Sequence, residues 1–127
     1  MPDLVALMPF AQRLGVQVEA ATKEEVRGRL DWRDDLCTAG GVMHGGALMA
    51  LADSVGAICA FLNLPDGATT ATLESKTNFF RAVRDGHVDA VAKPLHLGRT
   101  SIVVQTDLAD AEGKSVALVI QTQAILS

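Results

Sequence analysis

Apolar positions follow two patterns along the chain, short alternating segments and one long apolar run. Alternation with a period of two is typical of β-strands that bury one face. The alternating and apolar segments predict six strands, over 16–20, 26–32, 69–80, 88–97, 101–108 and 116–126. Two of these strands precede the apolar run and four follow it.

The apolar run predicts a central helix. It covers Ala47 to Leu62 and reads ALMALADSVGAICAFL, in which only Asp53, Ser54 and Gly56 are not apolar. A helix without a polar face is surrounded by lipid or by protein. Its length of about 24 Å is short for a bilayer crossing, which needs roughly 20 residues. We therefore expect a core helix that the rest of the chain encloses on every side.

Three shorter features complete the predicted fold. Asp3 is a suitable N-cap for an amphipathic helix that ends at Arg13. The segments 84–87 (RDGH) and 110–114 (DAEGK) are typical of hairpin turns. One antiparallel sheet wrapped around one long central helix, with a short N-terminal helix, is an α+β architecture. We expect a single domain over 1–127.

Charge and cysteine content exclude several classes of function. The 127 residues carry 15 acidic and 11 basic side chains, and only 4% are aromatic. Nucleic-acid binding draws on clustered Lys and Arg and on stacking aromatics, so we expect no nucleic-acid partner. Cys37 and Cys59 are 22 positions apart without paired histidines at ligand spacing, and we expect no metal site. Residues 1–13 do not resemble a signal peptide, which favours a cytoplasmic protein with reduced thiols.

Candidate chemistry begins in the loop before the apolar helix, which reads TAGGVMHGGA over 38–47. Gly45 and Gly46 allow a ligand or another backbone to approach closely. The first turn of a helix has unpaired N–H groups at its positive end, where an oxyanion is stabilised. The alternative is that the glycines only permit a tight loop and that His44 caps the helix or packs.

Asp53 is the only formally charged residue between Leu36 and Pro65. A buried carboxylate without a partner is costly, and this stretch contains no cation. Asp53 is therefore either solvated where the helix faces water, or a functional carboxylate in a cleft. Apolar residues at 49, 50 and 57 leave little room for a solvated stripe, which favours the functional interpretation.

The run GGVMHGGALMALAD, together with TATLESKTNFFRAV and HLGRTSIVV, resembles the hotdog-fold acyl-CoA thioesterases of the phenylacetate-degradation and 4-hydroxybenzoyl-CoA type. The resemblance covers about residues 32–126. It implies hydrolysis of an acyl-CoA thioester to the free acid and CoA, with CoA as part of the substrate and no separate cofactor. Both aromatic and medium-chain acyl groups are compatible with it.

The resemblance also implies a set of site residues. In such enzymes the glycine after the HGG histidine, here Gly45 after His44, donates its N–H to the thioester carbonyl. The carboxylate nine residues after that histidine is Asp53, as general base or as nucleophile. Thr72 matches the Ser or Thr of the following strand. Thr38 stands where the family usually has Asn or Gln, so the second oxyanion donor is left open.

Coenzyme A is polyanionic, so an acidic protein needs basic residues gathered at its site. Arg81 and Arg84 follow the third strand, and Gly98, Arg99 and Thr100 form a turn within the matching HLGRT segment. Guanidinium groups and the N–H groups of a turn bind phosphate. The alternative for each arginine is an ordinary surface position.

Helix geometry predicts a homodimer without reference to the family. Gly45 and Asp53 are eight residues apart, which is about 12 Å along one helix. A base and an oxyanion donor each act within about 3 Å of the reacting atoms. We therefore expect a two-fold dimer, or a dimer of dimers, in which Gly45 of one chain faces Asp53 of the other.

Two other classes of function compete with hydrolysis. A non-catalytic acyl-CoA sensor uses the same fold, but it needs no acid in the helix and usually carries a fused effector domain. Dehydratases and hydratases of the superfamily place a histidine for proton transfer on the substrate, which the HGG motif with Asp53 at the ninth position does not resemble.

Overall fold

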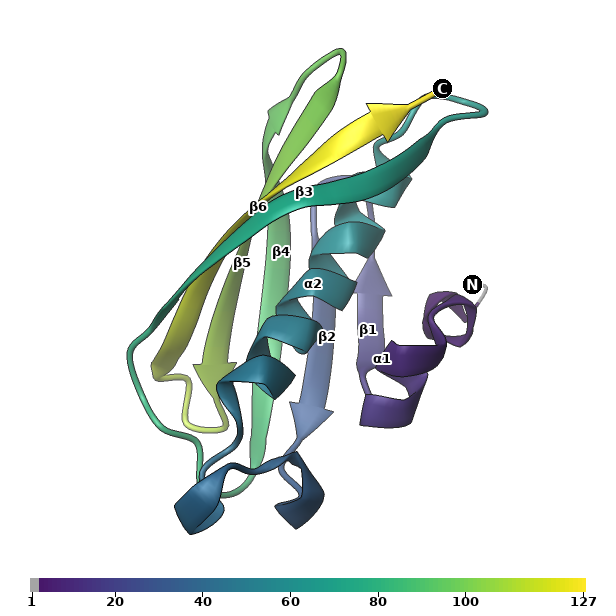
Figure 1. Cartoon of the computed structure of the whole chain (residues 1–127). Helices are drawn as coiled ribbons and strands as arrows, with labels where there is room; N and C mark the ends of the chain where they lie inside the picture. The colour runs from purple at the N-terminus through teal and green to yellow at the C-terminus, as the bar shows by residue number, and fades with distance from the viewer. Residues whose placement is uncertain (1–2) are drawn as a thin grey trace.

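A six-stranded antiparallel sheet curls around one long helix in the computed structural model, which describes residues 3–127 (Figure 1). The predicted domain, 1–127, thus includes two residues outside the described range. The strand order is β1-β2-β4-β5-β6-β3. The strands are β1 (Gln17–Ala21), β2 (Val26–Asp31), β3 (Thr69–Phe79), β4 (His87–Leu97), β5 (Ser101–Asp110) and β6 (Ser115–Leu126). The central helix is α2 (Gly45–Leu62). This confirms the predicted α+β class.

The core lies between α2 and the concave face of the sheet. Leu51 and Val55 on α2 are fully buried, and the inward positions of β4 and β5 alternate with outward ones as the period of two predicts. Burying one such aliphatic side chain contributes about 1.5–3 kcal/mol. Cys59 belongs to this core, and burial raises the pKa of its thiol to about 11. Both cysteines are free thiols.

One face of α2 stays uncovered, so the expectation that the chain encloses this helix on every side is wrong for a single chain. Gly46, Met49, Asp53 and Phe61 are exposed and follow one another at helical spacing along this face. One sheet covers only the side of a helix that it curls around, and the N-terminal segment packs against α2 without covering these four residues. By length and composition α2 could cross a membrane, but more than half of its residues are buried in the core.

The N-terminal helix is divided in two. A 3-10 turn, η1 (Leu4–Leu7), precedes α1 (Pro9–Leu14). The side chain of Asp3 accepts hydrogen bonds from the N–H groups of Val5 and Ala6, as expected of an N-cap. Pro9 disfavours helical backbone at the residue before it, and Met8 is not helical, with φ −120° and ψ 88°. Two further 3-10 turns, η2 (Asp34–Leu36) and η3 (Ala39–Gly41), lie in the loop before α2.

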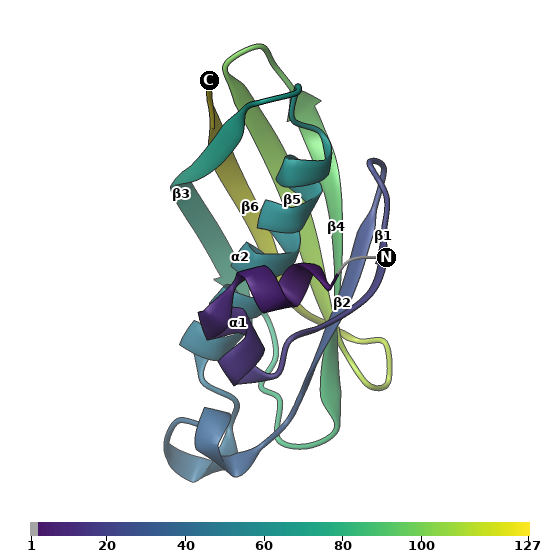
Figure 2. The same cartoon turned by 90° about the vertical axis from the view of Figure 1, so that its right-hand side faces the viewer.

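The two predicted turns have different outcomes. Residues 110–114 connect the paired strands β5 and β6, with the side chain of Asp110 accepting two N–H groups of the turn. Residues 84–87 are not a hairpin turn, because β3 pairs with β6 and is separated from β4 by two strands. Residues 80–86 instead connect opposite regions of the sheet (Figure 2). A turn signal shows that the chain reverses, not which strand it then joins.

Gly28 of β2 determines how closely α2 approaches the sheet. A Cβ at this position would lie 2.6 Å from Val55 Cγ2 and 3.1 Å from the carbonyl oxygen of Gln17. We expect Gly28→Ala to lower the free energy of unfolding by about 1–3 kcal/mol, because overpacking displaces the helix. Urea unfolding measures this change, with Arg27→Ala at the exposed neighbouring position as control. Equal stability of the two variants would contradict the tight packing.

Candidate active site

The N-terminal end of α2 is held by His44, which is the N-cap of the helix. The His44 side chain accepts the N–H of Gly46 through Nδ1 at 2.7 Å. Its backbone N–H donates to the carbonyl of Leu36 at 2.8 Å. The backbone N–H of Met43 donates to the carbonyl of Val83. His44 therefore positions the loop and the helix start, and its Nδ1 is already engaged in the cap.

Gly45 contributes an N–H group that is available to a ligand. It is the first residue of α2, and no residue from 3 to 127 accepts a hydrogen bond from its N–H. A pocket of about 350 Å³ lies beside it, lined also by Thr38, Phe79 and Arg81. The Phe79 ring is so close that a Cβ at Gly45 would lie 3.1 Å from its Cζ. Because the N–H of Gly46 is taken by His44, Gly45 is the donor that remains at the helix start.

Asp53 lies on the uncovered face of α2 and is exposed in the single chain. Its Oδ1 accepts a hydrogen bond of 3.0 Å from Nε2 of Gln121 and a longer contact of 3.4 Å from the Thr72 hydroxyl. Hydroxyl hydrogen bonds are usually near 2.7–2.8 Å, so the amide is the stronger partner. Thr72 thus lies where the sequence placed it, next to the carboxylate.

Gln121 and Gln123 are site residues that the sequence analysis missed. Both are buried polar side chains on β6, which faces α2 with otherwise apolar side chains. Gln123 Nε2 donates to the Thr72 hydroxyl at 2.7 Å, and its Oε1 lies 3.0 Å from the Thr70 hydroxyl. The sequence signal that could have indicated them is the presence of two amide side chains at inward positions of an otherwise apolar strand.

An apolar pocket begins one helical turn beyond Asp53. Its volume is about 180 Å³, and it lies between the C-terminal half of α2, strand β3 and the N-terminal segment. The lining residues are Leu4, Leu7, Met8, Ala57, Ile58, Phe61 and Thr70. All but one of them are apolar, so this pocket suits a hydrocarbon group.

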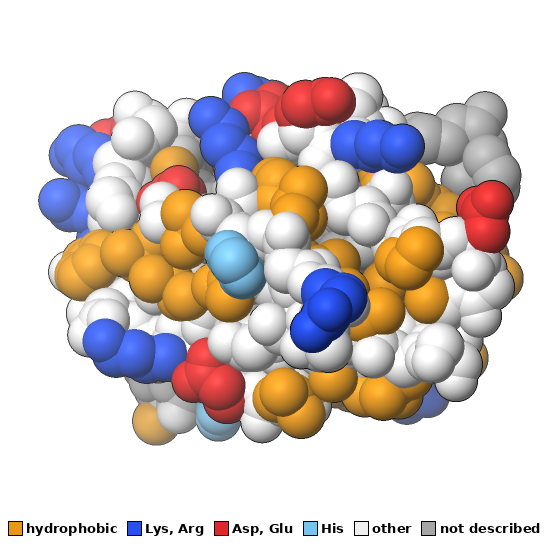
Figure 3. All heavy atoms as spheres, turned by 90° about the horizontal axis from the view of Figure 1, so that it is seen from above, with side chains coloured by type: hydrophobic (Ala, Val, Ile, Leu, Met, Phe, Trp, Pro, Cys, Tyr) orange, Lys and Arg blue, Asp and Glu red, His pale blue; other side chains and the backbone are white. Residues whose placement is uncertain are grey.

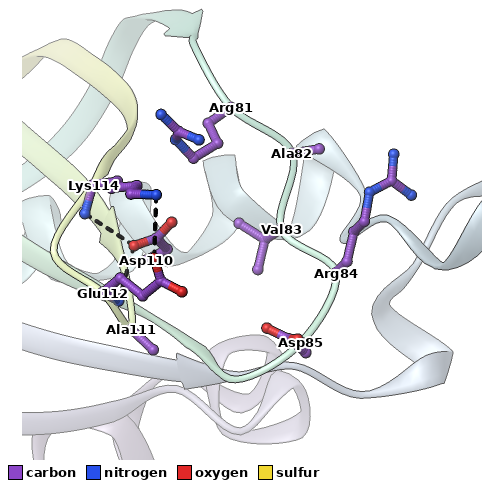
Figure 4. A pocket seen from close by; sticks show the side chains of 9 residues that line it. All are labelled: Arg81, Ala82, Val83, Arg84, Asp85, Asp110, Ala111, Glu112 and Lys114. Carbon is purple, nitrogen blue, oxygen red and sulfur yellow. Dashed lines mark hydrogen bonds and ion pairs between the residues drawn. The ribbon is translucent and has the colours of Figure 1, made fainter.

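Arg81 and Arg84 lie at the same end of the molecule as Gly45. Both line a pocket of about 260 Å³ beside the β5–β6 turn, where Arg81 faces Asp110 and Lys114 and Arg84 points away (Figure 4). Hydrogen bonds from backbone N–H groups of the turn, above all that of Lys114, lower the pKa of Asp110. The negative charge of this carboxylate offsets the nearby cations. Arg81 also lines the pocket of Gly45, which makes it the closer candidate for a phosphate.

The turn of Gly98, Arg99 and Thr100 lies at the opposite end, between β4 and β5. The N–H of Gly98 donates to the carbonyl of Ser101 at 2.9 Å and is not free for a phosphate. Arg99 and Thr100 are exposed. Figure 3 looks onto this end and shows basic side chains separated by apolar ones, without one continuous basic patch. In residues 3–127, no three His, Cys, Asp or Glu side chains are grouped to hold a metal ion.

The model of the thioesterase superfamily matches residues 40–117. The chain belongs to the thioesterase superfamily. It is 37% identical to the 1,4-dihydroxy-2-naphthoyl-CoA hydrolase of Escherichia coli over 86 residues, which are 68% of this chain and 63% of that enzyme. It is 38% identical to the proofreading thioesterase EntH of Cronobacter sakazakii over 74 residues, which are 58% of this chain and 54% of that one.

Solved structures of thioesterases support the same assignment. A thioesterase of Haemophilus influenzae superposes with a TM-score of 0.89 at 30% identity, covering 93% of this chain and 82% of that one. A thioesterase variant of Pseudomonas aeruginosa gives 0.90 at 30% identity, covering 99% and 95%. The fold is therefore the hotdog fold of thioesterases, and the chain is a thioester hydrolase.

Within this thioesterase the predicted site residues form three groups along α2. Thr38, His44, Gly45 and Gly46 lie at the N-terminal end of the helix, and Arg81 lies beside them. Asp53 and Thr72 lie near the middle. The Gly98–Thr100 turn lies at the far end. One chain therefore does not bring the oxyanion donor and the carboxylate together, since eight helical residues span about 12 Å.

Proposed function

We propose that this thioesterase hydrolyses acyl-CoA thioesters at a site shared by two chains, with Asp53 from one chain and the Gly45 N–H from the other. The observation that carries the proposal is the pair of groups on one uncovered helix face: a free N–H at the helix start and a hydrogen-bonded carboxylate. The E. coli relative that acts on a CoA thioester, named above, supports CoA as the leaving group.

The arrangement of the dimer follows from the positions of the two groups. Gly45 must meet the partner's Asp53 and Asp53 must meet the partner's Gly45, so the two helices run antiparallel across a two-fold axis. The residue midway between them, Met49, then lies on the axis. Met49 is 36% exposed, and the uncovered face around it is mainly apolar.

Strand β3 is the natural continuation of this interface. Among residues 3–127 it pairs with β6 only, so its other edge has backbone groups unpaired within this range. Leu73 and Phe79 on this strand are exposed as well. Exposed strand edges and exposed apolar patches are surfaces that protein–protein association commonly buries. Pairing β3 with the partner's β3 would cover the edge and bring the two α2 helices face to face.

The proposed chemistry uses each group in one role. The Gly45 N–H, at the positive end of α2, stabilises the oxyanion that forms on the thioester carbonyl. Asp53 takes a proton from water as hydroxide adds to the carbonyl carbon. The tetrahedral intermediate then expels the thiolate, which receives that proton. In the alternative route Asp53 attacks the carbonyl and expels the thiolate, and water hydrolyses the resulting anhydride.

Two further features support the substrate class. The apolar pocket next to Asp53 suits an aromatic or medium-chain acyl group. Arg81, beside Gly45, suits a phosphate of CoA, and the antiparallel arrangement brings the Arg99 turn of the partner toward the same end. Thr38 lines the pocket of Gly45 and is the candidate second oxyanion donor.

Thiol release from a panel of aromatic and medium-chain acyl-CoAs tests the function. We expect Asp53→Asn to lower kcat by about 100- to 10,000-fold, because removal of a general base has effects of this size. Asp66→Asn, at an exposed position after α2, is the control and should remain fully active. Binding without turnover by the wild type would indicate an acyl-CoA sensor. An Asp53→Asn variant as active as the wild type would remove Asp53 from the mechanism.

Sedimentation tests the arrangement of the dimer. We expect Met49→Lys to dissociate it, because two ammonium groups would be brought together in an apolar interface on the axis. Activity should fall with the dimer. Glu24→Lys introduces the same side chain at an exposed position in the turn between β1 and β2 and should leave assembly unchanged. A Met49→Lys protein with wild-type sedimentation would contradict the proposed axis.

A further inference from the structure

Asp53 is attached to the sheet through the buried side chain of Gln121. Gln121 lies on β6 with 0% of its surface exposed, and its Nε2 reaches Asp53 Oδ1 at 3.0 Å. A fully buried amide has few alternative conformations, since the surrounding core fills the space around it. The exposed carboxylate is therefore held by a donor that solvent does not reach.

A gap in α2 makes room for this amide. Gly56 lies three residues after Asp53, and a Cβ there would overlap Gln121 Oε1 and lie 2.8 Å from its Cδ. Any larger residue at 56 would push the amide away from the helix. The same gap is bordered by the hydroxyl of Thr106, 3.4 Å from that Cβ position. Gly56 thus lets Gln121 pass beneath the helix to Asp53.

A second, weaker contact reaches the same carboxylate oxygen. Gln123 Nε2 donates to the Thr72 hydroxyl at 2.7 Å, which leaves the hydroxyl hydrogen free to point at Asp53 Oδ1 at 3.4 Å. Both contacts from the sheet therefore end on Oδ1. No residue from 3 to 127 donates a hydrogen bond to Oδ2.

We propose that Gln121 is a positioning residue that holds Asp53 by Oδ1, so that Oδ2 is the oxygen that reacts. The inference rests on the proposed function, since it assumes that Asp53 is the base or nucleophile. Gln121 acts through Asp53 and does not touch the substrate. Gly56 has a supporting role, because it provides the space that the amide occupies.

On α2, β3 and β6, which carry Asp53 and the side chains that contact it, the other ionisable side chains lie away from Asp53. The ionisable side chains of β3 near this level, Glu74 and Lys76, are in register with Thr122 and Ile120, which point to the opposite face of the sheet from Gln121. On α2 the other ionisable side chain is that of Cys59, which lies in the core. Replacing Gln121 by an uncharged residue therefore removes the hydrogen bond to Asp53 without changing a charge on these elements.

Steady-state kinetics of Gln121→Met test the positioning role. Methionine keeps the volume of the side chain and removes the donor. We expect kcat to fall about 10- to 100-fold, the size of effect that follows misplacement of a reacting group, with KM changed less than about threefold.

Gln105→Met is the matched control. Gln105 is on the neighbouring strand β5, in register with Ile120 and therefore on the outer face of the sheet. It should leave kcat and KM unchanged. An unchanged kcat in folded Gln121→Met would overturn the proposal, provided that Asp53→Asn is inactive. If Asp53→Asn is active, it is the proposed function that fails.

A double-mutant cycle separates positioning from a general effect on folding. Gly56→Ala alone should lower kcat about as much as Gln121→Ala, because the new methyl group displaces the amide. In the Gln121→Ala background the methyl group occupies vacated space, so Gly56→Ala should lower kcat little further. Losses that multiply independently would show that Gly56 does not act through Gln121. Thermal unfolding of all four proteins verifies that each is folded.

Discussion

The packing of α2 into the concave face of the sheet determines the rest of the structure. Leu51 and Val55 fix which side of the helix is buried, and Gly28 fixes how closely it approaches. Once that side is set, Met49 and Asp53 must face outward. In the proposed dimer the catalytic face and the association face are the same surface, and a site on it is completed when a second chain covers it.

The position of the carboxylate within this face is a compromise between exposure and order. An Asp on an open helix surface is free to rotate, whereas a fully buried one would require a cation that this stretch of sequence does not contain. Gln121 resolves this by reaching from the sheet, through the gap at Gly56, to one oxygen of Asp53. The helix supplies the charge, and β6 supplies the donor that orients it.

Much of the fold was predictable from the sequence, because periodicity reports local burial directly. The six strands, the central helix and the positions of His44, Gly45 and Asp53 on or before it follow from residue pattern and motif. The far-edge position of β3 did not follow, since the turn signal at 84–87 is local and strand pairing is not. Gln121 was missed because an uncharged amide in an apolar strand gives a weak signal until the register shows which residue it faces. The apolar pattern alone does not reveal whether its own chain or another one covers α2, and an uncovered face was implied only by the predicted dimer, in which Gly45 of one chain faces Asp53 of the other.

A hybrid dimer tests most directly whether the site is shared between chains. Gly45→Pro removes the N–H, and proline is well tolerated at the first position of a helix. The ψ of 136° at His44 also suits a residue before proline. Gly45→Ala, which keeps the N–H, is the control for the added bulk near Phe79. Each homodimer of Gly45→Pro or of Asp53→Asn should be nearly inactive.

The hybrid of these two chains, isolated with two affinity tags, contains one site built from an unmodified Gly45 and an unmodified Asp53. We expect about half the activity of the wild-type dimer. A hybrid no more active than its parents would show that each chain works alone, and would contradict the account.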